Sequence, residues 1–252
     1  MVDLSVLTVS GKALFLAYDQ GLEHGPTDFT DANIDPNSIL EIASRGGYTG
    51  VILQKGIAEK YYTKHSLAKN IPLILKLNGK TNLVVDKEPY SPQICSVEEA
   101  VSLGAKAVGY TIYVGSEYEE RMFSEFAAIE EDAHKEGLPI VAWMYPRGKA
   151  TIGKDKEELC AYGARVGLEL GADIIKLQYP GSIEALSWAV KAAGEAKIVV
   201  SGGHKMPEED FFLLAHDVVE AGAIGMAVGR NIWQHKDPLA FSKKVRDSIF
   251  TK

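Results

Sequence analysis

A lysine interrupts one of the apolar runs of this 252-residue chain. Lys176 lies in the run 173–178, between Ile175 and Leu177. Neighbouring side chains of a strand point to opposite faces, so the two apolar neighbours belong against helices while Lys176 points into the interior. Burial or a neighbouring cation lowers the pKa of a lysine, and the neutral amine is the form that attacks a carbonyl to make an imine. The pattern therefore predicts covalent chemistry on a carbonyl substrate.

Further polar side chains fall late in other apolar runs, on the face that should point inward. Asp19 and Tyr145 end their runs, and Lys76 stands one residue before the end of its own. Lys76 is expected near Lys176, where its charge would help to keep the second amine neutral. Asp19 and Tyr145 are suited to moving the protons that imine chemistry requires.

Each of these assignments has a structural alternative. Lys176 and Asp19 could form a buried ion pair without chemistry, although such pairs rarely serve stability. Tyr145 could be a core aromatic with a satisfied hydroxyl, and Asp19 could cap the loop that follows it. Trp143 shares the face of Tyr145, and both barrel packing and substrate contact stay open for it.

Two glycine-containing segments follow later apolar runs and favour a phosphate site. They are Ser201-Gly202-Gly203-His204 and Val228-Gly229-Arg230-Asn231. Glycine lets backbone N–H groups approach phosphate oxygens, and arginine adds a forked, charged donor. A third segment, residues 21–26, follows the first run and contains His24; it could close over the site or hold another part of the substrate.

Eight apolar runs, separated by helical patterns, are available to position these side chains. The runs cover residues 13–19, 50–54, 72–77, 107–113, 139–145, 173–178, 197–201 and 223–228. Strands that alternate with helices form parallel β/α units, and eight units close a barrel whose active site lies at the carboxyl ends of the strands. We therefore predict an α/β fold with one (β/α)₈ TIM-barrel catalytic domain covering residues 1–252. An open doubly wound sheet is the alternative, but no G-x-G-x-x-G follows the first run.

Amphipathic patterns between the runs predict which helix faces pack on the barrel. Apolar residues recur at helical spacing in three sets: Met122, Phe126, Ile129 and Ala133; Leu159, Tyr162, Val166 and Leu170; and Phe211, Leu214, Val218 and Ala221. Each set forms one stripe on a helix, so we expect each stripe to be buried.

Composition narrows the ligand and the location. The net charge of −7 argues against nucleic acid or an anionic membrane as partner, although a local cationic pocket can still bind a small anion. Cys95 and Cys160 lie far apart, and no signal peptide or membrane-spanning run is evident, so we expect a cytoplasmic protein. Only His24 and His204 fall in loops at the barrel mouth, so we expect no metal and no other cofactor.

Motifs along most of the chain resemble the archaeal-type class I fructose-bisphosphate aldolases. They occupy residues 17–26, 75–80, 96–100, 143–148 and 227–231. The similarity extends from about residue 12 to about residue 245, and the run Glu23-His24-Gly25-Pro26 favours the bisphosphate aldolases over their relatives.

The resemblance implies a role for each site residue. Lys176 would form the Schiff base, Tyr145 would donate and accept protons, and Asp19 would assist the carbinolamine and proton steps. The phosphate of the dihydroxyacetone half would be held by Ser201, Gly202, Gly203, Gly229 and Arg230. Further substrate contacts are expected from Lys76, Trp143, Arg147 and His24.

The resemblance also implies a metal-free lyase and a large homo-oligomer, commonly a decamer. One position departs from the family, which usually has histidine where this chain has Gln20. If that histidine orients Asp19, the glutamine could do so as a neutral donor but could not carry a proton.

The expected reaction is reversible cleavage of fructose 1,6-bisphosphate into dihydroxyacetone phosphate and glyceraldehyde 3-phosphate. The nearest alternative is another Schiff-base enzyme of the same superfamily, such as an aldol transferase acting towards aromatic precursors or a thiolase-like enzyme acting on a phosphorylated signal molecule. An alternative from a different class is a sugar-phosphate sensor that binds without turnover.

Overall fold

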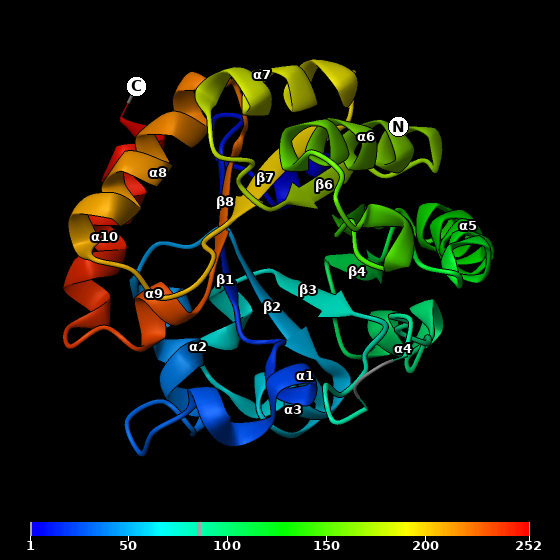
Figure 1. Cartoon of the computed structure of the whole chain (residues 1–252). Coiled ribbons are helices and arrows are strands. Elements are labelled where there is room, and N and C mark those ends of the chain that lie inside the picture. Colours follow the sequence, from blue (N-terminus) through cyan, green and yellow to red (C-terminus); the bar gives the residue numbers. More distant parts are fainter. Residues whose placement is uncertain (1, 85–86, 252) are drawn as a thin grey trace.

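Eight parallel strands form a closed barrel in the computed structural model, which describes residues 2–84 and 87–251 (Figure 1). The strands are β1 (Ala13–Ala17), β2 (Gly50–Gln54), β3 (Leu73–Lys76), β4 (Ala107–Ile112), β5 (Ile140–Met144), β6 (Ile174–Leu177), β7 (Lys197–Ser201) and β8 (Gly225–Val228). Each strand pairs with the next, and β8 pairs with β1 with Leu14 opposite Met226. The predicted barrel is confirmed, and the open doubly wound sheet is wrong.

Helices surround the barrel and connect its strands (Figure 1). They are α1 (Gly21–His24), α2 (Pro36–Arg45), α3 (Lys55–Lys60), α4 (Val97–Ser102), α5 (Glu119–Lys135), α6 (Lys156–Glu169), α7 (Ile183–Ala192), α8 (Glu208–Glu220), α9 (Arg230–Trp233) and α10 (Pro238–Phe250). Side-chain caps begin several of them; Asp155, for example, accepts hydrogen bonds from the backbone of Glu157 and Glu158 at the start of α6. Among the described helices, none is long and apolar enough to cross a membrane.

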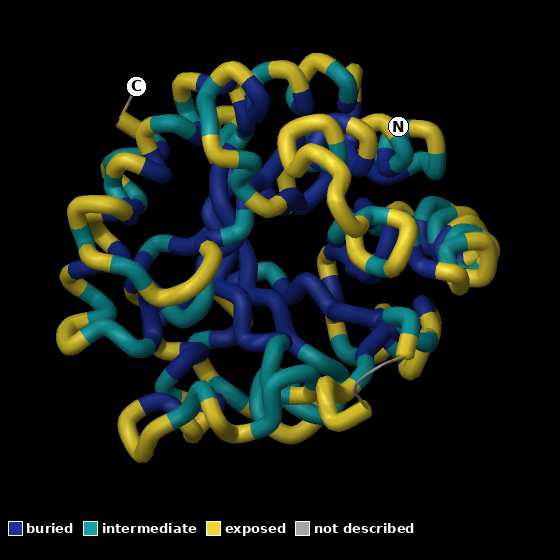
Figure 2. Tube along the Cα trace, viewed as in Figure 1, coloured by how far each residue is buried: buried dark blue, intermediate teal, exposed yellow. Residues whose placement is uncertain are grey.

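Apolar side chains pack in two layers, one inside the barrel and one between the strands and helices. Figure 2 shows the strands as buried and the outer surfaces of the helices as exposed. The inner layer contains Phe15, Ile74, Val141 and Ile174, and Leu7 packs with it. Since residues two apart share a face, the inner positions that follow these toward the carboxyl ends include Lys76 and Lys176. The barrel interior is thus lined by apolar side chains in its lower layers and by polar side chains at its mouth, as the alternation predicted.

The helix faces were predicted correctly for two helices and wrongly for a third. The stripes on α5 and α8 are buried as expected. On α6, however, Tyr162 is 61% exposed, and the buried face consists of Cys160, Ala161, Gly163, Ala164 and Gly167. A Cβ on Gly167 would lie 2.8 Å from the side chain of Ile175, so only very small residues let α6 approach the barrel this closely. Large apolar residues were therefore misleading there.

Candidate active site

A cleft of about 680 Å³ opens at the carboxyl ends of the strands. Its lining includes every residue predicted for the site: Asp19, His24, Lys76, Trp143, Tyr145, Arg147, Lys176, Ser201, Gly202, Gly203, Gly229 and Arg230. A larger hollow lies on the outer surface between α6 and α7, but it contains none of these residues. The chemistry-bearing side chains therefore converge on the barrel mouth, where the ends of separate strands meet.

Lys176 lies in the barrel interior with only 5% of its surface exposed. Its Nζ lies 5.2 Å from the ring centre of Trp143, which stands beside it on β5, and Lys76 Nζ lies 5.8 Å from the same ring. Burial lowers the pKa of Lys176 to about 8, and the charge of Lys76 acts in the same direction while Asp19 opposes both. The lowered pKa increases the share of this amine that is uncharged at neutral pH and able to attack a carbonyl.

Asp19 pairs with Lys76 rather than with Lys176. Lys76 Nζ lies 3.1 Å from Asp19 Oδ2, and both side chains are 8% exposed. Burial alone would raise the pKa of Asp19, but Lys76 and Lys176 together bring it below its ordinary value. Asp19 is therefore a carboxylate beside two amines. The predicted alternative of a Lys176–Asp19 ion pair is wrong, because Lys76 takes that place.

Tyr145 follows the last residue of β5 and presents its ring to the cleft. Its backbone N–H donates to the Ile112 carbonyl at 3.0 Å, which extends the barrel hydrogen bonding by one residue. Removal from water, followed by the negative charge of Asp19, raises the pKa of the Tyr145 hydroxyl. The hydroxyl is therefore protonated at neutral pH and ready to donate a proton or a hydrogen bond.

The two predicted phosphate loops are joined by Asn231. Its buried amide donates to the carbonyls of Gly202 and His204 at 2.8 and 2.9 Å, and its Oδ1 accepts the Met206 N–H at 2.9 Å. These bonds lock the loop after β7 against α9. Asn231 was expected only as part of the motif 227–231, because nothing in its sequence neighbourhood indicates that it links the two loops.

The glycines of these loops contribute in different ways. The Gly202 N–H donates to the Ala227 carbonyl at 3.0 Å, so it is engaged in barrel hydrogen bonding. Among the described residues, the N–H groups of Gly203 and Gly229 have no protein acceptor and remain available to an anion. Gly203 adopts a φ of 70°, which few other residues tolerate. Gly202 therefore leaves space for a phosphate because it has no side chain, while Gly203 and Gly229 provide free N–H donors.

A second cationic group lies across the mouth from Arg230. Arg147 Nη1 is 3.3 Å from Glu23 Oε1, and Lys80 Nζ is 4.0 Å from the same oxygen. Arg147 also lies over the ring of Tyr145, 5.4 Å from its centre. Glu23 lines the cleft, and neither it nor Lys80 was among the predicted site residues. Both occur within the motifs quoted from the sequence, but nothing local signalled that they meet.

Asn78 anchors the loop that carries Lys80. The side chain is fully buried; its amide donates to the carbonyls of Ser91 and Thr111, both at 2.9 Å, and its oxygen accepts the Thr111 N–H at 2.8 Å. These bonds fix the chain just beyond the last residue of β3, and the loop that follows brings Lys80 to within 4.0 Å of Glu23, which lines the cleft.

Gln20 does not orient Asp19. Its side chain lines the cleft, and its buried Nε2 has no hydrogen-bond partner among the described residues. The neutral donor is therefore present, as expected, but Lys76 is the group that holds the carboxylate. Among residues 2–84 and 87–251, no three His, Cys, Asp or Glu side chains are grouped closely enough to hold a metal ion.

Comparisons with known proteins identify the family of this chain. Residues 13–235 match the model of the DeoC/LacD family of aldolases. The class 1 fructose-bisphosphate aldolase of Thermoproteus tenax is 51% identical over 250 residues, which cover 98% of this chain and 93% of that protein. The class 1 fructose-bisphosphate aldolase of Halobacterium salinarum is 45% identical over 239 residues, covering 94% and 90%.

A solved structure shows the same architecture. It is an archaeal fructose-1,6-bisphosphate aldolase whose catalytic lysine is covalently bound to the carbinolamine intermediate of the substrate. That chain is 50% identical to this one, with a TM-score of 0.92 and coverage of 98% and 97%.

Proposed function

The chain belongs to the DeoC/LacD family of aldolases, and we propose that it is a class I aldolase that cleaves fructose 1,6-bisphosphate through a Schiff base on Lys176. The observation that carries the residue assignment is Lys176 itself. It is buried in the barrel and its pKa is lowered to about 8, with Asp19 and Tyr145 in the same cleft. Lysine in such surroundings is a nucleophile toward ketones.

Imine formation uses all three groups. Neutral Lys176 adds to the C2 ketone, and the proton of the nitrogen passes to the new oxygen with Asp19 as the nearby carboxylate. Tyr145, whose raised pKa keeps its hydroxyl protonated, gives its proton to the departing hydroxyl so that water leaves. The products are an iminium cation on Lys176 and a phenolate on Tyr145, two opposite charges that stabilise each other at the barrel mouth.

The same tyrosine then serves carbon–carbon cleavage. The phenolate takes the proton of the C4 hydroxyl, the C3–C4 bond breaks, and its electrons move into the iminium to give an enamine. Glyceraldehyde 3-phosphate leaves. Tyr145 returns the proton to C3, and water hydrolyses the imine to release dihydroxyacetone phosphate and free Lys176.

The two cationic groups suit the two phosphates. We propose that Arg230, with Ser201 and the glycines of its loops, holds the phosphate of the dihydroxyacetone half, and that Arg147 with Lys80 meets the other phosphate. His24 lies at the Arg230 side of the cleft through their shared neighbour Asp28. The ring of Trp143 lies below both lysines. We propose that it both packs in the barrel and contacts the substrate.

The test is to trap the imine and locate it. The protein is incubated with dihydroxyacetone phosphate, reduced with borohydride and digested, and we expect the adduct on Lys176. Tyr145→Phe should lower turnover of fructose 1,6-bisphosphate about a hundredfold or more, the usual scale for a positioned acid–base group. An adduct on another lysine, or Tyr145→Phe turnover near that of the unmodified protein, would contradict the assignment.

The remaining expectations concern the molecule as a whole. We propose that one domain covering residues 1–252 carries the full activity without nucleic acid or membrane, and that it works in glycolysis and gluconeogenesis. Both cysteines are unpaired and buried, which supports a cytoplasmic location. We further propose a homo-oligomer, for which the decamer of the resembled family is the expected size; exposed aromatic rings on α6 and α7 support such contacts.

A further inference from the structure

Two carboxylates of the loop after β1 each lie between two basic side chains. Asp28 ends the 3₁₀ turn Gly25–Asp28, and Glu23 lies in α1. Neither carboxylate contacts the reacting lysine, and nothing in the mechanism above uses them. Three of their partners, His24, Arg147 and Arg230, line the substrate cleft.

Asp28 holds His24 and Arg230 through a single oxygen. His24 Nδ1 lies 2.7 Å from Asp28 Oδ2, and Arg230 Nη1 lies 3.7 Å from it. Asp28 is itself fixed, because its carbonyl accepts the Gln234 side-chain amide at 2.7 Å. With Nδ1 bound to Asp28, the Nε2 of His24 is left for another partner.

Glu23 holds Arg147 and Lys80 in the same manner. Its Oε1 lies 3.3 Å from Arg147 Nη1 and 4.0 Å from Lys80 Nζ. The Glu23 backbone carbonyl accepts the Asn82 N–H at 3.0 Å, which ties the loop after β1 to the loop after β3.

The two pairs of basic side chains lie on opposite sides of the mouth. Arg230 follows β8, whereas Lys80 and Arg147 follow β3 and β5, which flank β4 across the eight-stranded ring. Figure 1 shows α9 on one side of the barrel and β4 on the other, with α1 between them. The loop after β1 therefore reaches both ends of any substrate that spans the cleft.

We propose that Asp28 and Glu23 are positioning residues, each of which orients one pair of basic side chains for one phosphate of a bisphosphate substrate. This inference rests on the proposed aldolase function. A long side chain that is already held loses less conformational freedom when its ligand arrives, and this preorganisation increases affinity. One carboxylate between two cationic side chains restricts their rotamers while leaving donors for the phosphate.

Long-range electrostatics and positioning predict opposite changes in phosphate affinity when either carboxylate is replaced by its amide. Replacing a carboxylate by its amide removes a negative charge near an incoming phosphate, so long-range attraction alone would tighten binding. If the carboxylate instead holds the cations in place, the same replacement weakens binding. We expect weakening of roughly tenfold, the scale of one hydrogen bond to a charged group.

Four ligands and two variants separate the two phosphate sites. Asp28→Asn should weaken the borohydride-trapped binding of dihydroxyacetone phosphate about tenfold, and it should leave the trapping of dihydroxyacetone, which has no phosphate, at the level of the unmodified protein.

Glu23→Gln should raise KM about tenfold for fructose 1,6-bisphosphate, with little change for fructose 1-phosphate, which lacks the second phosphate. The effects should fall on KM rather than on kcat. Asp31→Asn, at an exposed carboxylate of the same loop, is the matched control.

Tighter phosphate binding in either variant, or equal losses with phosphorylated and unphosphorylated ligands, would overturn the inference. A loss in Asp31→Asn as large as that in Asp28→Asn would also overturn it, because the effect would then belong to the loop in general. Failure of the unmodified protein to form any adduct on Lys176 is a separate result, since it would remove the proposed function itself.

Discussion

At the scale of the residue, the site depends on three buried charges that share one small space. Lys176, Lys76 and Asp19 are all nearly inaccessible to water, and only Lys76 and Asp19 form a direct ion pair. Burial is the largest influence on Lys176 and lowers its pKa; the charge of Asp19 opposes this, and the charge of Lys76 adds to it. Because the direct ion pair of Asp19 is with Lys76, Lys176 remains free of a salt-bridge partner and is the better placed of the two amines to act as the nucleophile.

Replacing Lys76 by methionine should change the pH dependence of imine formation. Lys76 helps to lower the pKa of Lys176, so its removal should raise that pKa from about 8, and Asp19 is then free to stabilise the charged amine. Neutral Lys176 increases with pH through its pKa, so the rate profile should move to higher pH. A midpoint that is higher by about one pH unit would make imine formation at neutral pH roughly tenfold slower.

The measurement is the rate of borohydride trapping with dihydroxyacetone, from about pH 6 to about pH 10. Lys76→Arg, which keeps the positive charge, is the control and should retain the original midpoint more closely. An unchanged profile in Lys76→Met would show that burial alone sets the reactivity of Lys176.

At the scale of the element, the site depends on a glycine in β4, whose missing side chain leaves room for the ring of Trp143. Trp143 of β5 lies across the barrel interior, and a Cβ on Gly109 of β4 would be only 1.8 Å from the ring. The ring is fully buried and lies beneath both lysines. Gly109 is therefore needed for close packing, not for an unusual backbone angle.

Gly109→Ala should destabilise the protein by about 1–3 kcal/mol, because the extra methyl forces the ring or the strand to move. Imine formation should also slow, since the floor of the site is displaced. Thermal or denaturant unfolding measures the first effect, and the double variant Gly109→Ala/Trp143→Leu should recover much of the lost stability. Gly56→Ala in α3, where an added Cβ meets nothing within 4 Å, is the control and should be neutral or slightly stabilising. Equal stability of Gly109→Ala and Gly56→Ala would refute the packing argument.

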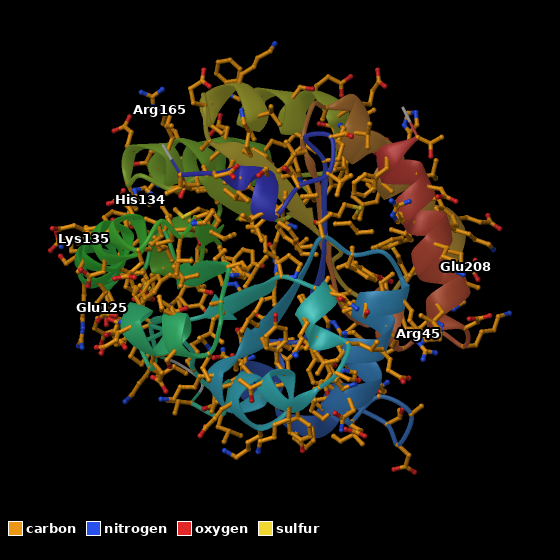
Figure 3. All side chains as sticks on the ribbon, turned by 180° about the vertical axis from the view of Figure 1, so that it is seen from behind. Arg45, Glu125, His134, Lys135, Arg165 and Glu208 are labelled. Atoms are coloured by element: carbon orange, nitrogen blue, oxygen red, sulfur yellow. The ribbon has the colours of Figure 1, made fainter. Side chains whose placement is uncertain are left out.

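At the scale of the whole molecule, we propose the groove between α6 and α7 as the contact with a second copy of the chain. Trp188 and Tyr162 line it and are 63% and 61% exposed, a combination that is unusual outside interfaces. Glu158 lies near the start of α6, and Arg165, two turns later, lies on the same face of the groove. Figure 3 shows Arg165 at the outer edge of the molecule. Arg165 also pairs with Glu169 of its own helix at 2.7 Å. In two copies related by a two-fold axis, we expect Arg165 of one copy to face Glu158 of the other.

Charge reversal tests this contact. Arg165→Glu alone should place like charges together and lower the molar mass measured by light scattering, whereas Glu158→Arg/Arg165→Glu should restore the assembly, because the reversed charges are again complementary. Trp188→Glu should also dissociate it. Arg45→Glu on α2 is the control and should leave the mass unchanged. A monomer in the unmodified protein, or an assembly indifferent to these changes, would refute this surface as an interface.

Much of this protein is determined by local sequence. Period-two alternation placed Lys176, Lys76 and Asp19 on inner faces, and the count of eight β/α units predicted the barrel; both are confirmed. These features follow from neighbours along the chain, because a strand's faces are decided by which side chains can leave water. The buried stripe of α6 is the exception, since close approach to the barrel depends on glycine and alanine, which carry little hydrophobic signal.

Only the tertiary structure decided which charged groups meet. Asp19 joins Lys76 across 57 positions, Glu23 joins Arg147 across 124, and Asp28 joins Arg230 across 202, as their residue numbers show. Nothing local specifies such partners; the closure of the barrel brings β1 beside β8 and turns the loop after β1 over the mouth. The sequence therefore determined which residues could do chemistry, and the closed barrel determined how their charges are shared, because electrostatic partners are set by distance in space and not along the chain.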